Sequence, residues 1–409
     1  VLQWIKKFNY STMGVPNGVS LDNFGNVYVA SSTDTTGVIA KFDTAGDTLW
    51  VRRYSESGKE TYFGKIQNND SNIYILGFNY ESFPLNSDIL TLKYNSEGIF
   101  KWAVKYTGPR PYGLDQVRGI AIDESGNTYV TGIADNGSSS RYDMATIKYD
   151  WNGVQKWVKI YNGAANLDDA PSAIKTDHSG NVIITGYSQW SGALGGINYT
   201  TIKYNSIGDT LWTRFYNGPS NDEDIAYDLD VDTTNKVYVT GRSLTTGTIY
   251  DIATLKYDEN GQQIWSKIYD GFGKNDIGLS VETDNSLNVY VSGTSKNILV
   301  DLLTIKYSQV VGLATIISEA PCDFQLLQNY PNPFNPYTKI RFKIAKSSTV
   351  QIKIYDVLGR ELKELVNADL KPAGYEVDFD GSNFASGVYF YSIISDGNMI
   401  STKTMILNK

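Results

Sequence analysis

Apolar and polar residues alternate with a period of two over short segments of this chain, and turn residues separate the segments. In residues 117–161 the segments VRGIAID, TYVTG, DMATIKY and VQKWVKIY follow one another, and ESGN and DWNG are two of the turns between them. This alternation is typical of half-buried strands, and Gly and Asn supply the positive φ of tight hairpins. The unit is therefore predicted to form four antiparallel strands.

The same unit recurs along the chain, most visibly where its third strand leads into a Trp-bearing fourth strand. A repeat of this length cannot bury its own hydrophobic face, so it must stack on its neighbours. Four antiparallel strands per unit predict the blades of a β-propeller. The recurring segments are KFDTAGDTLW (41–50), KYNSEGIFKW (93–102), KYDWNGVQKW (148–157), KYNSIGDTLW (203–212) and KYDENGQQIW (256–265).

The two ends of the repeat region are complementary. The chain opens with LQWIKKFNY (2–10), which reads as a fourth strand, and the repeats end with DLLTIKY (301–307), a third strand with no Trp strand after it. We therefore predict a composite closing blade, in which Trp4 lies beside Thr304 and its strand pairs antiparallel with residues 301–307. This gives six four-stranded blades, of which the other five begin near Val15, Gly64, Val117, Pro171 and Ile225.

The pattern changes after residue 307. Residues 308–323 lack the repeat and read as a linker or a docking strand, while residues 324–409 contain about seven short strands. Such a stretch predicts a small Ig-like β-sandwich. The predicted organisation is all-β throughout: a propeller over 1–307, a linker over 308–323 and a sandwich over 324–409.

Composition narrows the chemistry. The net charge of −8 argues against nucleic acid, and no apolar run approaches the length that spans a bilayer. Cys322 is the only cysteine and His178, in a turn, the only histidine. A Ser-His-Asp triad, a Cys/His pair or a zinc site is therefore not expected, and no phosphate-binding or hydrolase motif is present.

The repeat resembles a known family. DESGNTYVTG (123–132), DMATIKYDWNG (143–153) and the pair Trp157 and Tyr161 are similar to the bacterial SBBP-type β-propeller repeat. The resemblance covers about residues 1–307 and implies the fold, but no single activity. The customary name of that repeat implies seven blades, against the six counted here.

The end of the chain strongly resembles the type A C-terminal sorting domain of type IX secretion cargo. This resemblance implies export across the outer membrane, release or attachment at the cell surface, and the type IX machinery as a partner. The interpretation left open by the residues themselves is an ordinary Ig-like accessory domain. The matching positions are Asn329, Tyr330, Pro331, Asn332, Pro333 and Phe334, Gly359 in IYDVLGRE, and Gly387 and Tyr389 in FASGVYFY.

Two series of acidic residues recur in the blades. The first opens the innermost strands of four blades, with Asp168, Asp222 and Glu223 nearby, and it could form a Ca²⁺-binding rim or cap the entry loops through backbone N–H groups. We favour capping, and we expect a structural role for the second series as well. The first series is Asp115, Asp169, Asp224 and Asp276; the second, opening the third strands, is Asp88, Asp143, Asn198, Asp251 and Asp301.

Loops that differ between blades are better candidates for binding a ligand. The longest, residues 187–198, carries Tyr187 and Trp190. These rings could stack on a sugar or a partner protein, or pack on the next blade.

The sequence thus predicts a secreted, surface-displayed propeller that binds or scaffolds without catalysis or a cofactor, Ca²⁺ being the one ion considered. Its expected partner is a glycan or a surface protein. The first alternative is an extracellular polysaccharide lyase or glycoside hydrolase that uses the acidic rim, because glycosidases need two nearby carboxylates. The second is a subunit of an extracellular protein array.

Overall fold

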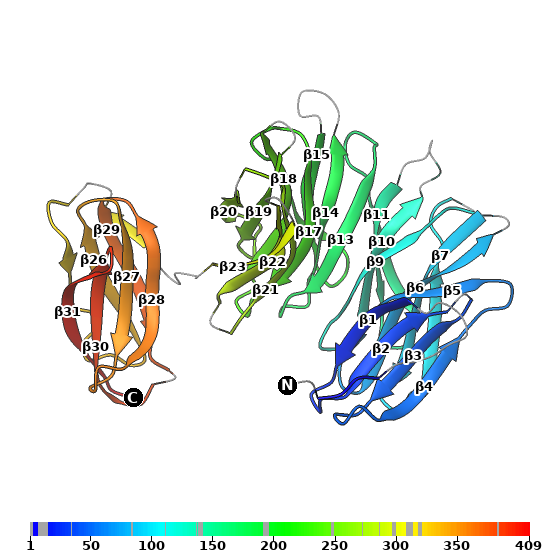
Figure 1. Cartoon of the computed structure of the whole chain (residues 1–409), viewed down its shortest axis with the longest axis horizontal. Coiled ribbons are helices and arrows are strands. Elements are labelled where there is room, and N and C mark those ends of the chain that lie inside the picture. The colour runs from blue at the N-terminus through cyan, green and yellow to red at the C-terminus, as the bar shows by residue number, and fades with distance from the viewer. Residues whose placement is uncertain are drawn as a thin grey trace. The chain divides into compact units, whose positions relative to one another are not determined.

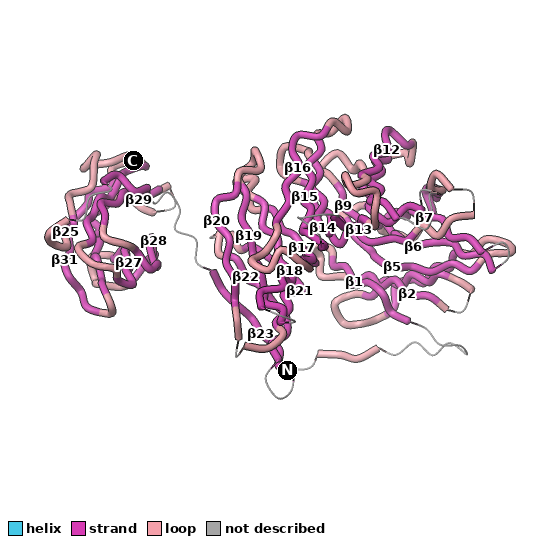
Figure 2. The backbone as a smooth tube through the Cα atoms, turned by 90° about the horizontal axis from the view of Figure 1, so that it is seen from above, coloured by secondary structure: helices cyan, strands magenta, loops and turns pink. Residues whose placement is uncertain are grey.

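The computed structural model is built from strands and loops (Figure 2). Its described residues form no helix, so none of them forms one able to cross a membrane. The chain divides into two compact units, one comprising Val1–Ser286 and Tyr290–Lys306 and the other essentially Tyr307–Lys409. The structure describes residues 3–409 except 7–14, 34, 83–84, 111, 136, 138–141, 191–195, 247–248, 272, 286, 297–299, 308–313, 318–320 and 383.

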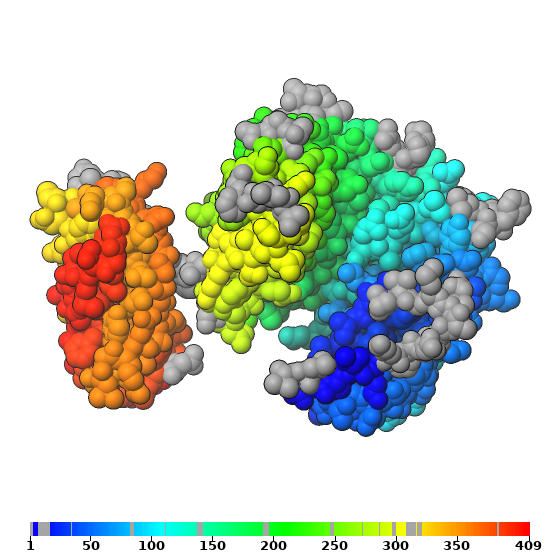
Figure 3. Space-filling view, viewed as in Figure 1, coloured from blue at the N-terminus to red at the C-terminus, as the bar shows by residue number. Residues whose placement is uncertain are grey.

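The first unit is a β-propeller whose sheets each join consecutive antiparallel strands (Figure 1). The first strand of each sheet packs against the first strand of the next, and Figure 3 shows the sheets in chain order from blue to yellow. The first three sheets comprise β1 (Val15–Leu21), β2 (Val27–Ser32), β3 (Gly37–Phe42) and β4 (Thr48–Tyr54); β5 (Glu60–Asn68), β6 (Asn72–Ser82), β7 (Leu85–Asn95) and β8 (Phe100–Tyr106); and β9 (Gln116–Ile122), β10 (Thr128–Asp135), β11 (Tyr142–Tyr149) and β12 (Gln155–Tyr161).

The remaining sheets continue this order, and the sixth has three strands in the described residues. They comprise β13 (Asp169–Thr176), β14 (Val182–Trp190), β15 (Gly196–Tyr204) and β16 (Thr210–Tyr216); β17 (Asp224–Val231), β18 (Val237–Thr246), β19 (Ile249–Tyr257) and β20 (Gln263–Tyr269); and β21 (Asp276–Thr283), β22 (Val289–Lys296) and β23 (Val300–Tyr307).

An aspartate closes the hairpin between the first two strands of a sheet. In the fourth sheet, Oδ1 of Asp177 accepts hydrogen bonds from the backbone N–H groups of Ser179 at 2.9 Å and Asn181 at 2.8 Å. In the first, third, fifth and sixth sheets a tyrosine six residues later donates its hydroxyl to this aspartate, as Tyr129 does to Asp123. The fourth sheet has Ile183 at that position, and its Asp177 forms a buried ion pair with Lys203, with Nζ and Oδ2 2.7 Å apart.

The recurring Trp of the fourth strand joins neighbouring sheets. Nε1 of Trp102 donates to the carbonyl of Trp151 at 3.2 Å, in the turn between the third and fourth strands of the next sheet. Gly153 in that turn has a φ of 83°, and a Cβ there would lie 2.8 Å from the Trp102 ring. The Trp and the turn glycine therefore recur together because each ring lies flat on a glycine of the next blade.

Trp4 makes this inter-blade contact but not the predicted strand pairing. Its Nε1 donates to the carbonyl of Thr44 at 3.2 Å, in the equivalent turn of the first sheet. Residues 3–6 form no strand, and β23 pairs with β22 alone. The predicted pairing of Trp4 with residues 301–307 is therefore wrong for the described residues, because residues 3–6 form no ladder with β23 and Trp4 keeps only the contact with the turn. Residues 1–2 and 7–10 of that segment lie outside the described part.

The uncovered third strand of the sixth sheet shows what the fourth strand does elsewhere. In β23 the side chain of Leu302 is 94% exposed, whereas every residue of β3 is buried. Third strands of the complete sheets are buried because a fourth strand and the next blade cover them.

The second unit is a β-sandwich of two four-stranded antiparallel sheets, in the orders β24-β29-β26-β25 and β28-β27-β30-β31. Apolar residues from both sheets, such as Phe342, Val377, Ile352 and Ile393, form one shared core. Its strands are β24 (Ala314–Ile317), β25 (Gln325–Leu326), β26 (Tyr337–Ile344), β27 (Ser348–Tyr355), β28 (Glu361–Leu370), β29 (Ala373–Asp380), β30 (Gly387–Ser395) and β31 (Asn398–Leu407).

Part of the segment predicted as a linker or a docking strand forms a strand. Within residues 308–323, the segment Ala314–Ile317 pairs antiparallel with β29 and so belongs to the sandwich. A short apolar segment next to a sheet edge satisfies its backbone groups by extending that sheet. The linker therefore includes a docking strand.

Candidate functional site

The innermost strands of the first five blades share a one-residue β-bulge at the same place. The unpaired residues are Asn17 in β1, Gly64 in β5, Arg118 in β9, Ser172 in β13 and Tyr227 in β17. A bulge leaves one residue out of the ladder and redirects its side chain. The backbone feature repeats while the side chain changes from blade to blade, which is what a ligand site built on a symmetric scaffold requires.

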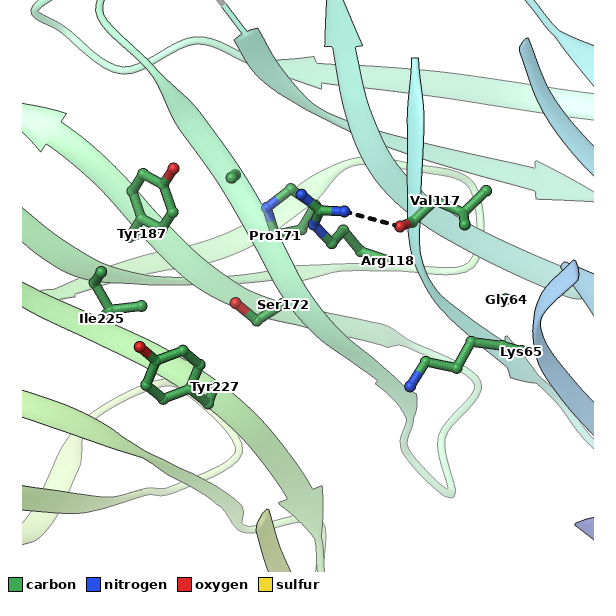
Figure 4. Close-up of a pocket in the computed structure, with 10 residues that line it drawn as sticks. Gly64, Lys65, Val117, Arg118, Pro171, Ser172, Tyr187, Ile225 and Tyr227 are labelled. Atoms are coloured by element: carbon green, nitrogen blue, oxygen red, sulfur yellow. Dashed lines mark hydrogen bonds between the residues drawn. The ribbon is translucent and has the colours of Figure 1, made fainter. Parts of the chain in front are cut away.

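The bulges of β5, β9, β13 and β17 line a pocket of about 540 Å³, here called the central pocket (Figure 4). Its wall comes from the innermost strands of the second to fifth blades and from β14. In the view, Tyr187 and Tyr227 lie on one side and Lys65 on the other, with Ser172 and Arg118 between them. The lining residues are Gly64, Lys65, Val117, Arg118, Ala170, Pro171, Ser172, Tyr187, Ile225 and Tyr227.

The polar groups of the central pocket are cationic or phenolic. Arg118 is half-buried, and its guanidinium donates to the carbonyl of Val117 at 3.2 Å and to Oε1 of Gln116 at 3.1 Å. Burial lowers the pKa of Arg118 and raises the pKa of the Tyr187 and Tyr227 hydroxyls. The pocket therefore presents two neutral phenols beside two cationic side chains, the half-buried Arg118 and the exposed Lys65.

The structure separates the two predicted aromatic residues. Both lie on strand β14 rather than in a loop, and residues 191–195 of the predicted loop are outside the described part. Tyr187 lines the central pocket. Trp190 packs edge-on against Phe215, with ring centroids 5.0 Å apart. Only Tyr187 is thus placed to meet a ligand in this pocket.

The first series of aspartates is buried at the junctions between blades. Each carboxylate accepts the backbone N–H of the glycine that follows the preceding fourth strand, so that it closes the loop before its own strand. None of the four lines the central pocket. The accepting Oδ2 atoms and donors are Asp115 with Gly108 at 2.6 Å, Asp169 with Gly163 at 2.6 Å, Asp224 with Gly218 at 2.6 Å and Asp276 with Gly271 at 2.5 Å.

The second series lies beside the first, across each junction. The residue before Asp88 bridges in parallel to the residue before Asp115, and the residue before Asn198 bridges to the residue before Asp224. The four members that face a following blade are buried, and Asp301, in the sixth sheet, is exposed. The two series therefore meet in pairs at successive junctions instead of forming one shared ring.

We expect these buried carboxylates to make stability fall as the pH rises from about 4 to about 6. Burial raises the pKa of Asp115, Asp169 and Asp224 to about 6, although the glycine N–H bonds act in the opposite direction. The unfolded groups have a pKa of about 4, so the folded protein binds more protons in this window. Ionising one such group costs about 3 kcal/mol.

Denaturant unfolding of the wild type and Asp169→Asn at about pH 4 and about pH 7 tests this dependence. The amide oxygen still accepts from Gly163, but the variant cannot ionise. It should therefore lose one group's share of the pH dependence. An identical pH dependence in the two proteins would contradict the prediction.

In the second unit, the sorting-motif residues have mainly structural contacts. Asn329 is buried and its side-chain amide donates to Oγ1 of Thr338 at 3.0 Å. Phe334 is 2% exposed, and its backbone pairs with the last strand through Ile406 and Asn408. Four further motif residues have different surroundings. Tyr330 is exposed, Gly359 takes a φ of 77° in a turn, Gly387 is the first residue of β30, and the hydroxyl of Tyr389 donates to the carbonyl of Ala385.

Sequence reasoning missed most of the central pocket, namely Lys65, Arg118, Ser172 and Tyr227. A bulge is invisible in the alternation of apolar and polar residues, because it changes the side-chain direction without a fixed residue type. The sequence carries no signal for these bulges, because the bulge residue and both of its neighbours change in type from blade to blade.

Two models of known protein families match parts of the chain. A model of the secretion system C-terminal sorting domain matches residues 328–408, and a model of the β-propeller repeat matches residues 104–137. No curated protein matches the chain.

Solved structures resemble the chain at very low identity. An α-L-arabinofuranosidase of Fusarium graminearum with arabinobiose is 9% identical, with 72% of this chain and 92% of that chain covered and a TM-score of 0.44. A catalytically inactive virginiamycin B lyase of Staphylococcus aureus with quinupristin is 12% identical, covering 73% and 87%, with a TM-score of 0.40. The β-propeller domain of the Trilobed protease from Pyrococcus furiosus is 8% identical, covering 84% and 93%, with a TM-score of 0.40.

These similarities are too distant to carry an activity across. The two family matches do identify the parts of the chain, and the tail places the protein outside the cell or at its surface. The first unit is therefore a β-propeller in which residues 104–137 match the bacterial SBBP-type repeat, and residues 328–408 of the second unit match a type IX secretion sorting domain.

Proposed function

We propose that this secreted protein is a non-catalytic binding protein whose central pocket takes up an acidic polysaccharide. The observation that carries the proposal is the set of side chains at and beside the bulges: Arg118, Lys65, Ser172 and two tyrosines. A guanidinium matches the geometry of a carboxylate, and tyrosine offers a rigid apolar ring with a polar tip. A chain of uronic acids combines both requirements.

The arrangement around Tyr227 supports a preformed site. The guanidinium of Arg242 lies 6.0 Å from the Tyr227 ring centroid and 4.5 Å from that of Tyr250. Arg242 is also ion-paired with Glu223. Glu223 fixes the position of Arg242, and Arg242 in turn contacts the Tyr227 ring. The ring is therefore held in place before any ligand binds, which lowers the entropic cost of binding.

The carboxylates of this region favour binding over catalysis. Glycosidases need two carboxyl groups about 5–10 Å apart across the scissile bond. Within the described residues, neither aspartate nor glutamate lines the central pocket. Asp228 and Asp230, further along the innermost strand β17, hold the next blade: Asp228 accepts from the N–H of Val281 at 3.0 Å and Asp230 from that of Thr283 at 2.8 Å.

Calorimetric titration of the full chain with oligogalacturonates tests the proposal. We expect binding that weakens as salt is added, and no binding of neutral galacto-oligosaccharides of the same length. Arg118→Ala should weaken binding at least about tenfold, or about 1.4 kcal/mol, because it removes the bidentate donor.

Lys101→Ala is the matched control, since it removes an exposed cation from the outer strand β8, which contributes no residue to the pocket. Equal affinity for neutral and acidic oligomers would refute the ligand class. Shortening of the oligomers during incubation would refute the non-catalytic role and favour an enzyme.

A further inference from the structure

Three carboxylates meet at the junction between the fifth and sixth blades. Oxygen atoms of Asp251, Asp270 and Asp276 all lie within 4.8 Å of one another. Asp251 and Asp276 are 4% and 0% exposed, while Asp270 is exposed. Among the described residues, no ion pair joins any of them to a lysine or arginine, although three like charges this close repel strongly at a buried site.

Each carboxylate has one oxygen that accepts a hydrogen bond from the protein. The held oxygens accept from the N–H of Gly271 for Asp276, from the hydroxyl of Thr245 for Asp251 and from the N–H of Gly273 for Asp270. Oδ1 of Asp251 and Oδ1 of Asp276 are buried without a hydrogen-bond partner. The fold thus orients each carboxylate through one oxygen, and it leaves one buried oxygen of Asp251 and one of Asp276 available to a ligand.

A buried hydroxyl beside the cluster also lacks a partner. Ser295 is 6% exposed, and its Oγ makes no hydrogen bond. A Cβ placed on Gly271 would lie 2.8 Å from this Oγ and 3.1 Å from Oδ2 of Asp276, so the hydroxyl and the carboxylate border the same glycine. Buried polar atoms are rarely left unsatisfied, and an ion or water at the cluster is the usual reason.

The third carboxylate breaks the repeat. Asp270 stands at the same distance along the chain from the second-series residue Asp251 as Thr107, Asn162 and Asn217 stand from the second-series residues of their own blades. These three residues are therefore its equivalents at the other junctions. A residue shared by every blade for a structural reason would not change to an acid at one junction only. Asp270 therefore adds a ligand where the other junctions have a neutral side chain.

We propose that Asp251, Asp270 and Asp276 bind one calcium ion, which ties the sixth blade to the fifth. Calcium is bound by carboxylate oxygens at 2.3–2.6 Å, so ligands of one ion lie at most about 5 Å apart. The separation within this cluster meets that limit. The site differs from the rim predicted from the sequence, because it uses one residue of each series and Asp270 instead of aspartates from several blades.

The test is calorimetric titration of the chelator-treated full chain with CaCl₂, alongside thermal melts. One equivalent of Ca²⁺ should bind at the micromolar to millimolar concentrations of weak extracellular sites, and the melting temperature should rise with Ca²⁺ more than with Mg²⁺. No binding up to about a few millimolar Ca²⁺ would overturn the proposal.

Asp270→Asn places at this junction the residue found at the equivalent positions 162 and 217, so its melting temperature in chelator should match that of the wild type. It should weaken Ca²⁺ binding at least about tenfold, since one charged ligand is lost. The matched control is Asp143→Asn, which removes a second-series carboxylate from a junction with two acids and should leave binding unchanged. Wild-type affinity in Asp270→Asn, or an equal loss in Asp143→Asn, would refute the assignment.

Discussion

Replacing Asp177 with alanine should lower the free energy of unfolding of the propeller by about 3–5 kcal/mol. The side chains of Asp177 and Lys203 are 0% and 3% exposed, and their charged atoms are 2.7 Å apart. Without the carboxylate, the Lys203 ammonium stays buried with only the Glu259 carbonyl, at 3.3 Å, as a partner. A buried charge that loses its counter-charge is far less stable than a pair.

Denaturant unfolding of the full chain measures this loss. Asp258→Ala is the matched control: Asp258 caps a turn through the N–H groups of Asn260 and Gln262, but it has no ion pair among the described residues. That variant should lose only about 1–2 kcal/mol. Adding Lys203→Met to Asp177→Ala should restore part of the stability, and a double variant no more stable than the single one would show that the buried charge is not the cause.

Replacing Phe334 with alanine should cost the sandwich about 3–5 kcal/mol and abolish export of the protein. Phe334 is 2% exposed, and its ring centroid lies 5.8 Å from that of Phe379 in the core. Its N–H donates to Ile406 at 2.9 Å, and its carbonyl accepts from Asn408 at 3.0 Å. The expected loss is comparable to the whole stability of a small domain, so the tail should be largely unfolded.

Secretion of the full chain, or of a foreign cargo fused to residues 314–409, in a type IX-competent host is the measurement. Tyr330→Ala is the control for folding, since Tyr330 is 79% exposed and its loss leaves the core intact. Export of Phe334→Ala at the wild-type level would show that the motif acts as an extended signal rather than through the folded sandwich. Loss of export in a fully folded Tyr330→Ala would identify Tyr330 as a contact of the secretion machinery.

Local patterns in the sequence were sufficient for the strands of the propeller and for the nature of the tail. Alternation with turn glycines predicted the four-stranded units, because each hairpin forms through contacts between residues close in the chain. The recurring Trp and glycine likewise marked the blade interface, since each Trp ring needs a residue without a side chain opposite it. The sorting motif could be recognised because residues 329–334 are consecutive and the other matching positions lie in short local segments.

The tertiary structure alone decided where side chains from different blades meet. The bulges that direct Arg118 and Tyr227 into the central pocket depend on strand register, which residue types do not encode. Trp4 reads as part of an outer strand, but its position is set by a turn of the first sheet. Asp270 and Asp276 lie at the two ends of one short loop, and Asp251 on β19 meets them only because the sixth blade packs on the fifth.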